Sequence, residues 1–397
     1  MESDQSMIRG IILLGLAYVL SQFFRAFLAV LSPFLRADIG ANPEDLAFAS
    51  GLWFFAFAAM QLPVGWALDT IGPRRTSATL LLIGGGGGAA LFAMATQPLH
   101  IDFAMVLIGI GCAPVLMASY YIFAREFPPA RFVVLASVMV GVGTFGNLVA
   151  SYPTAIAAET IGWRASLWAL CAITTLTALG IWALVHDPAT PEGEERGSLL
   201  AVLKIKALWF IFPIMSVSYA QLGALRGLWI GPYFEDVFTA DAHQIGIATL
   251  LMGIAMVIGT FAYGPLDKLI GSTKLIVIVA TTLNLAALVG LVLYPASSLV
   301  LSTVFMAAVG FFGATYALVI SHGRKFLPPQ LIGRGMTLLN LCSIGGVGVA
   351  QFLSGKAYAA SQPATSLQTP YVVIFTLFAA LMAAGLFIYL FSRETSE

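Results

Sequence analysis

The stretch Ile11–Pro33, IILLGLAYVLSQFFRAFLAVLSP, is long and apolar enough to cross a lipid bilayer, which takes about 20 residues. It nevertheless carries a full charge, Arg25, and has no acidic residue to pair with it. An arginine at the centre of a membrane costs about 2.5–3.5 kcal/mol on insertion scales, so such side chains face a polar cavity or a partner. We therefore expect Arg25 to face the interior of a helix bundle.

A second arginine occupies the matching place in the other half of the chain. Arg226 lies in the apolar stretch 207–233, 201 positions after Arg25. No other lysine or arginine falls deep inside a predicted membrane span, and neither does any aspartate or glutamate. The counter-ion of the two arginines is therefore expected to be a substrate anion, and no side chain is expected to carry a coupling proton. The alternative is that both arginines snorkel or bind backbone carbonyls.

The composition predicts an all-α, polytopic membrane protein. The 397 residues are 59% hydrophobic and 10% charged, whereas soluble domains carry about 25% charged residues. The net charge is zero, so we expect no nucleic-acid partner. No cluster has the spacing of metal ligands and no cofactor-binding motif has its required context, so we expect neither a metal nor a cofactor.

Apolar runs of spanning length predict twelve transmembrane helices, named spans 1–12 in chain order. They cover residues 10–33, 46–68, 77–96, 101–124, 132–157, 164–185, 207–233, 244–266, 274–294, 298–320, 334–357 and 370–392. The long polar interruption, 186–206, predicts a linker loop between a bundle at 1–185 and another at 207–397.

Lysine and arginine in the loops predict the orientation, because cytoplasmic loops are enriched in them. An inward N-terminus leaves only Arg36, Arg164 and Lys356 on the outer side. Both termini and the linker are then cytoplasmic, and we expect a multi-pass protein of a bacterial inner membrane.

The two halves repeat. The residues Gly72 and Gly271 are 199 positions apart, and so are Asn42 and Asp241, both expected to cap the second span of their half. Further matches at offsets of 199 or 200 are Arg125 with Arg324, Phe127 with Phe326, and Pro128-Pro129 with Pro328-Pro329. These matches predict two pseudo-symmetric six-helix bundles, with substrate bound at the repeat interface.

Glycines in span 5 match G-x-G-x-x-G at Gly141, Gly143 and Gly146, but no strand precedes them. We interpret them as a stripe of small residues that lets helices approach closely. A similar stripe in span 11 comprises Gly345, Gly346 and Gly348.

The loop after span 2 reads GWALDTIGPRR from Gly65 to Arg75. It resembles the G-x-x-x-D-x-x-G-x-R/K-R/K motif of the major facilitator superfamily, and Gly264–Lys274 is a degraded copy in the second half. The resemblance implies a secondary transporter with alternating access, in which this loop closes the cytoplasmic side. The gating residues it implies are Gly65, Asp69, Gly72, Arg74, Arg75 and Asp267.

The same resemblance implies that spans 1, 4, 7 and 10 line the central cavity. Arginine binds carboxylate or phosphate through a planar fork of donors, so Arg25 and Arg226 are expected to hold the substrate between them. The other predicted contacts share their helix faces or offer cavity hydroxyls. They are Tyr18, Gln22, Tyr120, Tyr121, Tyr219, Trp229, Tyr233 and Tyr316.

We expect the substrate to be a small organic anion or a carboxylate-bearing metabolite, and the protein to act as a monomer. The arrangement is similar to the organophosphate:phosphate antiporter branch and also to branches that carry zwitterionic amino acids or small peptides. Drug efflux is disfavoured because span 5 lacks the glycine-proline pattern of the drug antiporters. An intramembrane enzyme is not expected, since no catalytic motif is present. A receptor that binds without transport is a further alternative.

Overall fold

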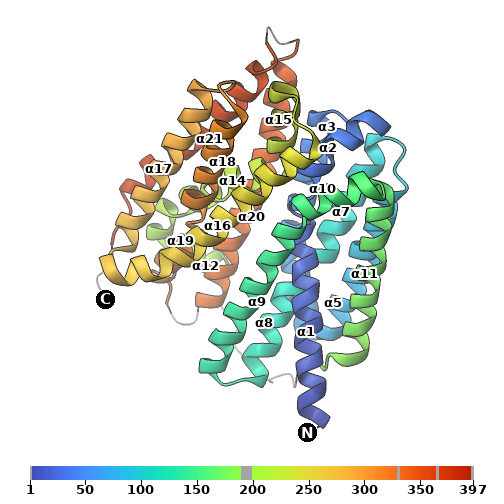
Figure 1. The fold of residues 1–397 in the computed structure, drawn as a ribbon. Helices are drawn as coiled ribbons and strands as arrows, with labels where there is room; N and C mark the ends of the chain where they lie inside the picture. Colours follow the sequence, from blue (N-terminus) through green and yellow to red (C-terminus); the bar gives the residue numbers. More distant parts are fainter. Residues whose placement is uncertain (1, 189–198, 329–330, 364–365, 395–397) are drawn as a thin grey trace. The chain divides into compact units, whose positions relative to one another are not determined.

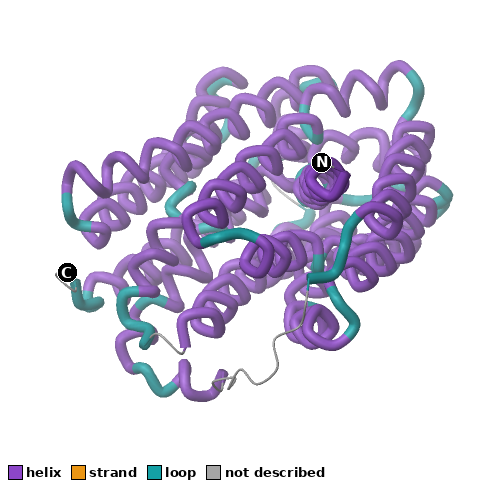
Figure 2. Tube along the Cα trace, turned by 90° about the horizontal axis from the view of Figure 1, so that it is seen from below, coloured by secondary structure: helices purple, strands orange, loops and turns teal. Residues whose placement is uncertain are grey.

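The computed structural model describes residues 2–188, 199–328, 331–363 and 366–394, and helices are the only regular structure in these ranges (Figure 2). The chain divides into two compact units, Met1–Gly193 and Glu194–Glu397. The boundary lies inside the predicted linker at 186–206, of which residues 189–198 are outside the described residues. The limits of that linker stay a prediction. The all-α prediction is confirmed.

Unit 1, blue to green in Figure 1, contains the predicted spans 1–6. Its elements are α1 Glu2–Phe23, α2 Leu28–Ile39, α3 Pro43–Ala59, α4 Gln61–Thr70, α5 Pro73–Leu80, a π-helical segment η1 Leu81–Gly86, α6 Gly87–Ala93, α7 Pro98–Cys112, α8 Val115–Glu126, α9 Pro129–Val149, α10 Tyr152–Thr160 and α11 Trp163–Leu184.

Unit 2, yellow-green to red in Figure 1, contains spans 7–12. Its elements are α12 Leu199–Leu203, a 3₁₀ turn η2 Lys206–Phe210, α13 Phe212–Ser218, α14 Ala220–Ala224, a π-helical turn η3 Leu225–Trp229, α15 Ile230–Phe238, α16 Ala242–Ile270, α17 Thr273–Leu293, α18 Leu299–Gly313, α19 Tyr316–Arg324, α20 Ile332–Ala360 and α21 Thr369–Leu390.

Ten helical stretches of the described chain are long and apolar enough to cross a membrane, and twelve result when two bent pairs each count as one span. The bent pairs are span 1, with 55° between Met7–Phe23 and Leu28–Ile39, and span 5, with 41° between Val134–Val149 and Tyr152–Thr160. Pro153 explains the second bend, because proline removes a backbone donor and disfavours helix at the preceding residue. The twelve predicted spans correspond to these helices.

The predicted helix caps confirm that the repeat extends to local structure. At the start of α3, the Asn42 N–H donates to the Asp45 carboxylate (2.9 Å). At the start of α16, the Gln244 N–H donates to the Asp241 carboxylate (2.8 Å) and the Asp241 N–H donates back to the Gln244 side chain (3.1 Å). Both are capping boxes, which satisfy the first free N–H groups of a helix.

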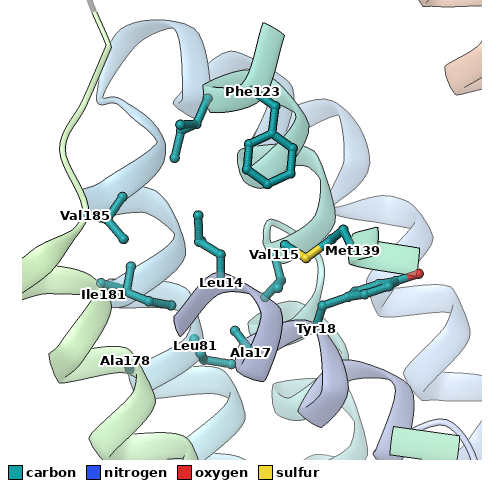
Figure 3. Close-up of a cluster of buried hydrophobic side chains, with 12 residues drawn as sticks. Leu14, Ala17, Tyr18, Leu81, Val115, Phe123, Met139, Ala178, Ile181 and Val185 are labelled. Carbon is teal, nitrogen blue, oxygen red and sulfur yellow. The ribbon is translucent and has the colours of Figure 1, made fainter. Parts of the chain in front are cut away.

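The core of unit 1 forms where α1 meets four neighbouring spans. Figure 3 shows an apolar cluster in which Leu14 and Ala17 of α1 lie among side chains from the other helices. The partners include Leu81, Val115, Phe123, Met139, Ala178, Ile181 and Val185. This packing fixes the half of span 1 that precedes Arg25.

Glycines let the repeated helices approach to backbone contact, as the sequence predicts. A Cβ added at Gly146 of α9 would lie 1.9 Å from the Val19 carbonyl oxygen of α1. A Cβ added at Gly346 of α20 would lie 2.0 Å from the Ser216 oxygen of α13. Any side chain here would force the helices apart, and close approach of this kind is what associates helices in lipid.

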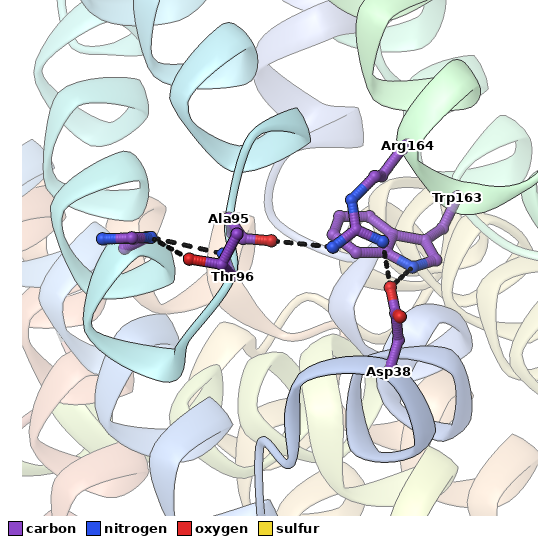
Figure 4. A network of polar contacts seen from close by, with 6 residues as sticks. Asp38, Ala95, Thr96, Trp163 and Arg164 are labelled. Carbon is purple, nitrogen blue, oxygen red and sulfur yellow. Dashed lines mark hydrogen bonds and ion pairs between the residues drawn. The ribbon is translucent and has the colours of Figure 1, made fainter.

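An aspartate ties the end of the first span of each unit to the start of the sixth. In unit 1, Asp38 of α2 accepts from the Trp163 indole (3.1 Å) and from Arg164 of α11, whose guanidinium also donates to the Ala95 carbonyl oxygen (2.9 Å) (Figure 4). In unit 2, Asp236 of α15 accepts from the Tyr371 hydroxyl of α21 at 2.5 Å. These contacts hold the half-spans that follow the two arginines.

Candidate functional site

The four spans predicted to line the cavity all interrupt their α-helical pattern part-way along. Span 1 breaks between Phe23 and Leu28, and span 7 contains the π-helical turn Leu225–Trp229. Span 4 breaks after Cys112, next to Pro114, and span 10 breaks after Gly313. The last two breaks are 201 positions apart, the same offset as Arg25 and Arg226. Spans 2, 3 and 5 are also interrupted, so interruptions are not confined to the four predicted cavity spans. Single π-helical turns, such as that of span 7, are frequent at functional sites.

Arg25 lies inside the break of span 1. The backbone there makes tight turns, in which the Arg25 N–H donates to the Gln22 carbonyl oxygen (3.3 Å). The Arg25 guanidinium carbon lies 5.3 Å from the Trp53 ring centroid and 4.9 Å from that of Phe57. Its Nε is buried and has no hydrogen-bond partner among the described residues. The break therefore directs a cationic side chain onto aromatic rings.

Two other predicted contacts of span 1 are joined to each other. The Gln22 amide donates to the Tyr18 hydroxyl oxygen at 2.7 Å, and both side chains are buried. In Figure 3 the Tyr18 oxygen points away from the apolar cluster. Tyr18 and Gln22 thus share one face of α1, as their spacing of four residues predicts. The predicted place of Arg25 on the same face stays a prediction, because Arg25 lies in the break that follows α1.

The tyrosines of span 4 separate. Tyr120 of α8 packs against the cluster that contains Tyr18, and its ring lies 6.0 Å from that of Phe132. Tyr121 faces another way, because the Arg125 guanidinium carbon lies 3.5 Å from its ring centroid. The structure therefore places Tyr120 near Tyr18 and engages Tyr121 with a residue in the last turn of the same helix, α8.

Arg226 has a different setting from Arg25. It lies within the π-helical turn of span 7 and is 1% exposed. A π-helical turn inserts one residue into the helical pattern and so redirects the side chains around it. In the same unit, the ring of Tyr219 lies 6.1 Å from that of Tyr316, whose hydroxyl donates to the Asn340 side-chain oxygen (2.7 Å).

Trp229 and Tyr233 belong to an aromatic group inside unit 2. The Trp229 indole donates to the Ser354 hydroxyl (2.8 Å), and the Tyr233 hydroxyl donates to the Pro295 carbonyl oxygen (2.6 Å). Both rings are 0% exposed. Their polar atoms thus bond to protein partners, and their predicted contact with substrate stays a prediction.

The predicted gating loop forms a tight turn between α4 and α5. Gly72 has φ +100° and its counterpart Gly271 has φ +69°, conformations that favour glycine, as the sequence predicts. Asp69 and Asp267 occupy the last turns of α4 and α16. The predicted gating role of the loop stays a prediction.

Three other residues of the predicted gate differ in their surroundings. Gly65 of α4 has open space where a side chain would stand. Arg75 is exposed, whereas Arg74 is half-buried and binds an aspartate.

That aspartate, Asp187, was not predicted. The Arg74 N–H donates to its carboxylate (2.7 Å), and the Arg74 Nε lies 3.7 Å from the other oxygen. A Cβ on Gly72 would lie 2.7 Å from the same carboxylate, so the absence of a side chain at Gly72 lets Asp187 approach this closely. A carboxylate at a helix N-terminus is favoured by the free N–H groups there. Asp187 follows α11, so the predicted gating loop is fastened to the end of span 6.

Trp53 and Phe57 were also missed as neighbours of Arg25. Nothing in their spacing relates them to span 1, because the contact joins residues about 30 positions apart on another helix. The sequence shows that span 2 is rich in aromatic residues, but it does not show which helix their side chains face.

Residues 14–230, more than half of the chain, match the family model of the Major Facilitator Superfamily. The chain belongs to the major facilitator superfamily. Two relatives are the "Uncharacterized transporter YybO" of Bacillus subtilis, 20% identical over 281 residues, and the "Probable sulfoacetate transporter SauU" of Cupriavidus necator, 21% identical over 275 residues. These alignments cover 65% and 64% of this chain and 63% of each relative, so the chain matches less than two thirds of their lengths.

Solved transporter structures share the fold over nearly the whole chain. A mutant of the nucleoside transporter NupG aligns with a TM-score of 0.78 at 14% identity, covering 97% of this chain and 100% of that one. A D-xylose-proton symporter aligns with a TM-score of 0.76 at 15% identity over 98% of both chains. A bacterial homolog of the human lysosomal transporter Spinster aligns with a TM-score of 0.74 at 15% identity, also over 98% of both. The predicted family and fold class are confirmed.

Proposed function

We propose that this protein is a secondary transporter that moves a small organic anion by alternating access, with Arg25 and Arg226 binding the substrate. The observation that carries the proposal is the setting of Arg25. Its guanidinium lies in a helix break of a membrane span, against two aromatic rings, and makes no ion pair with a described residue. A charge placed in this way is stabilised when an anion binds.

The chemistry of guanidinium narrows the substrate class. Its planar fork matches carboxylate, phosphate and sulfonate groups, which offer two acceptor oxygens in one plane. The name of the relative SauU refers to sulfoacetate, which carries a carboxylate and a sulfonate. We propose an anion of this size and charge, and we keep zwitterionic amino acids or small peptides as the second candidate, since one arginine could hold their carboxylate.

A binding screen tests the substrate class. Purified protein is heated with sulfoacetate, succinate, inorganic phosphate, alanine or alanyl-alanine, and a ligand that binds the folded state raises Tm. We expect the dianions to stabilise the protein more than the zwitterions. Stabilisation by alanine or alanyl-alanine alone would favour the second candidate.

Arginine variants test the two binding residues. A hydrogen bond to a charged group is worth about 1.5–3 kcal/mol, so Arg25→Ala or Arg226→Ala should weaken binding of the best anion about 10- to 100-fold. Arg25→Lys keeps the charge but loses the fork, so it should recover part of this loss. The two alanine substitutions should combine non-additively, since either disrupts one site. Lys356→Ala is the charge-matched control, because Lys356 is exposed.

Unchanged anion affinity in either single alanine variant would remove that arginine from the site. Counterflow in liposomes separates a transporter from a receptor, because a receptor binds the anion without exchanging it across the membrane. Absence of counterflow with intact binding would overturn transport.

A further inference from the structure

Two aromatic side chains of span 2 hold the guanidinium of Arg25. The Trp53 and Phe57 rings are stacked on each other, with centroids 5.2 Å apart and 17° between their planes. Both lie one helical turn apart on α3, and both have the Arg25 guanidinium carbon within about 5 Å of their centroids. Cation–π contact occurs when a guanidinium lies within about 6 Å of a ring centroid. We name Trp53 and Phe57 the aromatic platform.

The platform is held rigidly in unit 1. Trp53 is 0% exposed and Phe57 is 5% exposed. A Cβ added at Gly109 of α7 would lie 2.5 Å from the Trp53 carbonyl oxygen, so α7 packs directly on the backbone that carries the platform. The Trp53 indole N–H is buried and makes no hydrogen bond to a described residue, so packing rather than a bond to another side chain holds this ring.

An aromatic ring and a carboxylate hold an arginine with different consequences. A carboxylate neutralises the guanidinium and occupies its N–H donors. A ring attracts the cation through its quadrupole, so it leaves the charge uncompensated and takes up no donor. Within the described part of unit 1, the platform rings lie against the Arg25 guanidinium, and no carboxylate forms an ion pair with it.

We propose that Trp53 and Phe57 are positioning residues that fix Arg25 while keeping its charge and donors free for the substrate anion. The inference rests on the proposed function, because it requires that Arg25 binds the anion. Anion selectivity then depends on a second helix, span 2, which contributes rings rather than charges.

Ring-removing variants give the first test, with sulfoacetate and succinate as probes. A desolvated cation–π contact is worth up to about 2 kcal/mol, so Trp53→Leu and Phe57→Leu should each weaken anion binding about 5- to 30-fold. Trp53→Phe keeps a ring and should retain most of the affinity. Phe123→Leu is the matched control, since Phe123 is a buried ring of the same unit outside the platform. A loss in Trp53→Phe as large as in Trp53→Leu would assign the role to the indole N–H and overturn the platform.

A charge-introducing pair gives the sharper test. Phe57→Glu places a carboxylate beside Arg25, and Phe57→Gln has nearly the same shape without the charge. We expect Phe57→Glu to bind the anions at least tenfold more weakly than Phe57→Gln, while its ligand-free Tm is equal or higher. A merely structural role of Phe57 predicts the same affinity in both variants, and that result would overturn the inference.

The two proposals fail in different ways. If Arg25→Ala weakens binding but the platform variants and Phe57→Glu match their controls, the platform is wrong and the proposed function stands. If the wild-type protein binds neither probe, or Arg25→Ala binds as the wild type does, the proposed function is overturned and the platform with it.

Discussion

The two units place an arginine at the same position of their first span but surround it differently. Arg25 of unit 1 lies in an open break of the helix, is partly exposed and rests on two rings. Arg226 of unit 2 lies in a continuous π-helical turn and is 1% exposed. Duplication has therefore preserved where the helix is interrupted, while the form of the interruption and the exposure of the charge have diverged. Arg25 is therefore the more exposed of the two proposed ligands.

The contacts that hold the following half-spans have diverged in the same way. Asp38 accepts from a tryptophan and an arginine, and the Asp38–Arg164 ion pair is about 40% exposed on both sides. Asp236 accepts from a tyrosine, whose ring is 0% exposed. Unit 1 uses an exposed ion pair where unit 2 uses a largely buried neutral donor.

The largest loss of folding yield is expected at the close helix contacts that the two units share. Gly146→Leu and Gly346→Leu each insert a side chain where a Cβ would already lie about 2 Å from a backbone oxygen of the neighbouring helix. We expect both variants to lose folding yield and anion counterflow. Gly141→Ala and Gly345→Ala, which meet no atom within 4 Å, are the controls and should behave as the wild type. Normal expression and Tm in one leucine variant would show that the units do not share this packing requirement.

The second effect concerns the contribution of the two arginines to the Tm of the ligand-free protein. Truncating a long apolar side chain in a core costs about 2–5 kcal/mol, because the cavity does not collapse fully, and removing the buried Arg226 side chain leaves a cavity in the same way. Arg226→Ala should therefore lower Tm more than Arg25→Ala, whose side chain is partly exposed. Arg226→Met, which restores volume, should regain part of the loss. Equal or reversed Tm changes, measured in one detergent, would remove the proposed difference between the settings.

The third effect concerns the gating loops, of which only that of unit 1 keeps the complete motif. Asp69→Asn should slow counterflow several-fold while leaving anion affinity nearly unchanged, since Asp69 lies at the end of α4, far along the chain from the break. Asp267→Asn should have a weaker effect, because its loop is a degraded copy. Wild-type counterflow in Asp69→Asn would contradict the gate, and a larger effect in Asp267→Asn would reverse the comparison.

The smallest effects are expected at the aspartate contacts. Tyr371→Phe removes one hydrogen bond to a carboxylate from the largely buried contact and should cost about 1.5–3 kcal/mol. Arg164→Ala removes a partly exposed ion pair, which typically contributes about 0.2–1 kcal/mol. High salt should diminish the effect of Arg164→Ala and leave that of Tyr371→Phe unchanged. Thermal unfolding at low and high salt measures both.

Much of the architecture could be predicted because its causes are local. Span lengths follow from the thickness of a bilayer, and the capping residues Asn42 and Asp241 act on the turn that follows them. The positive φ of Gly72 and the close approach at Gly146 were likewise predicted from residue type. The Tyr18–Gln22 bond could be expected from their spacing, because side chains four residues apart on a helix are neighbours.

The sequence by itself determined the membrane class, the duplicated six-helix units and the arginine in the first span of each. Only the tertiary structure decided that Trp53 and Phe57 lie against Arg25, that Asp187 fastens the gating loop, and that Trp229 and Tyr233 bond inside unit 2. Hydropathy and helical periodicity act within one helix, and they say which face is polar but not which helix meets it. The contacts that surround a charged side chain such as Arg25 join different helices. Which helices meet depends on how the helices pack and bend, and hydropathy and periodicity do not encode that.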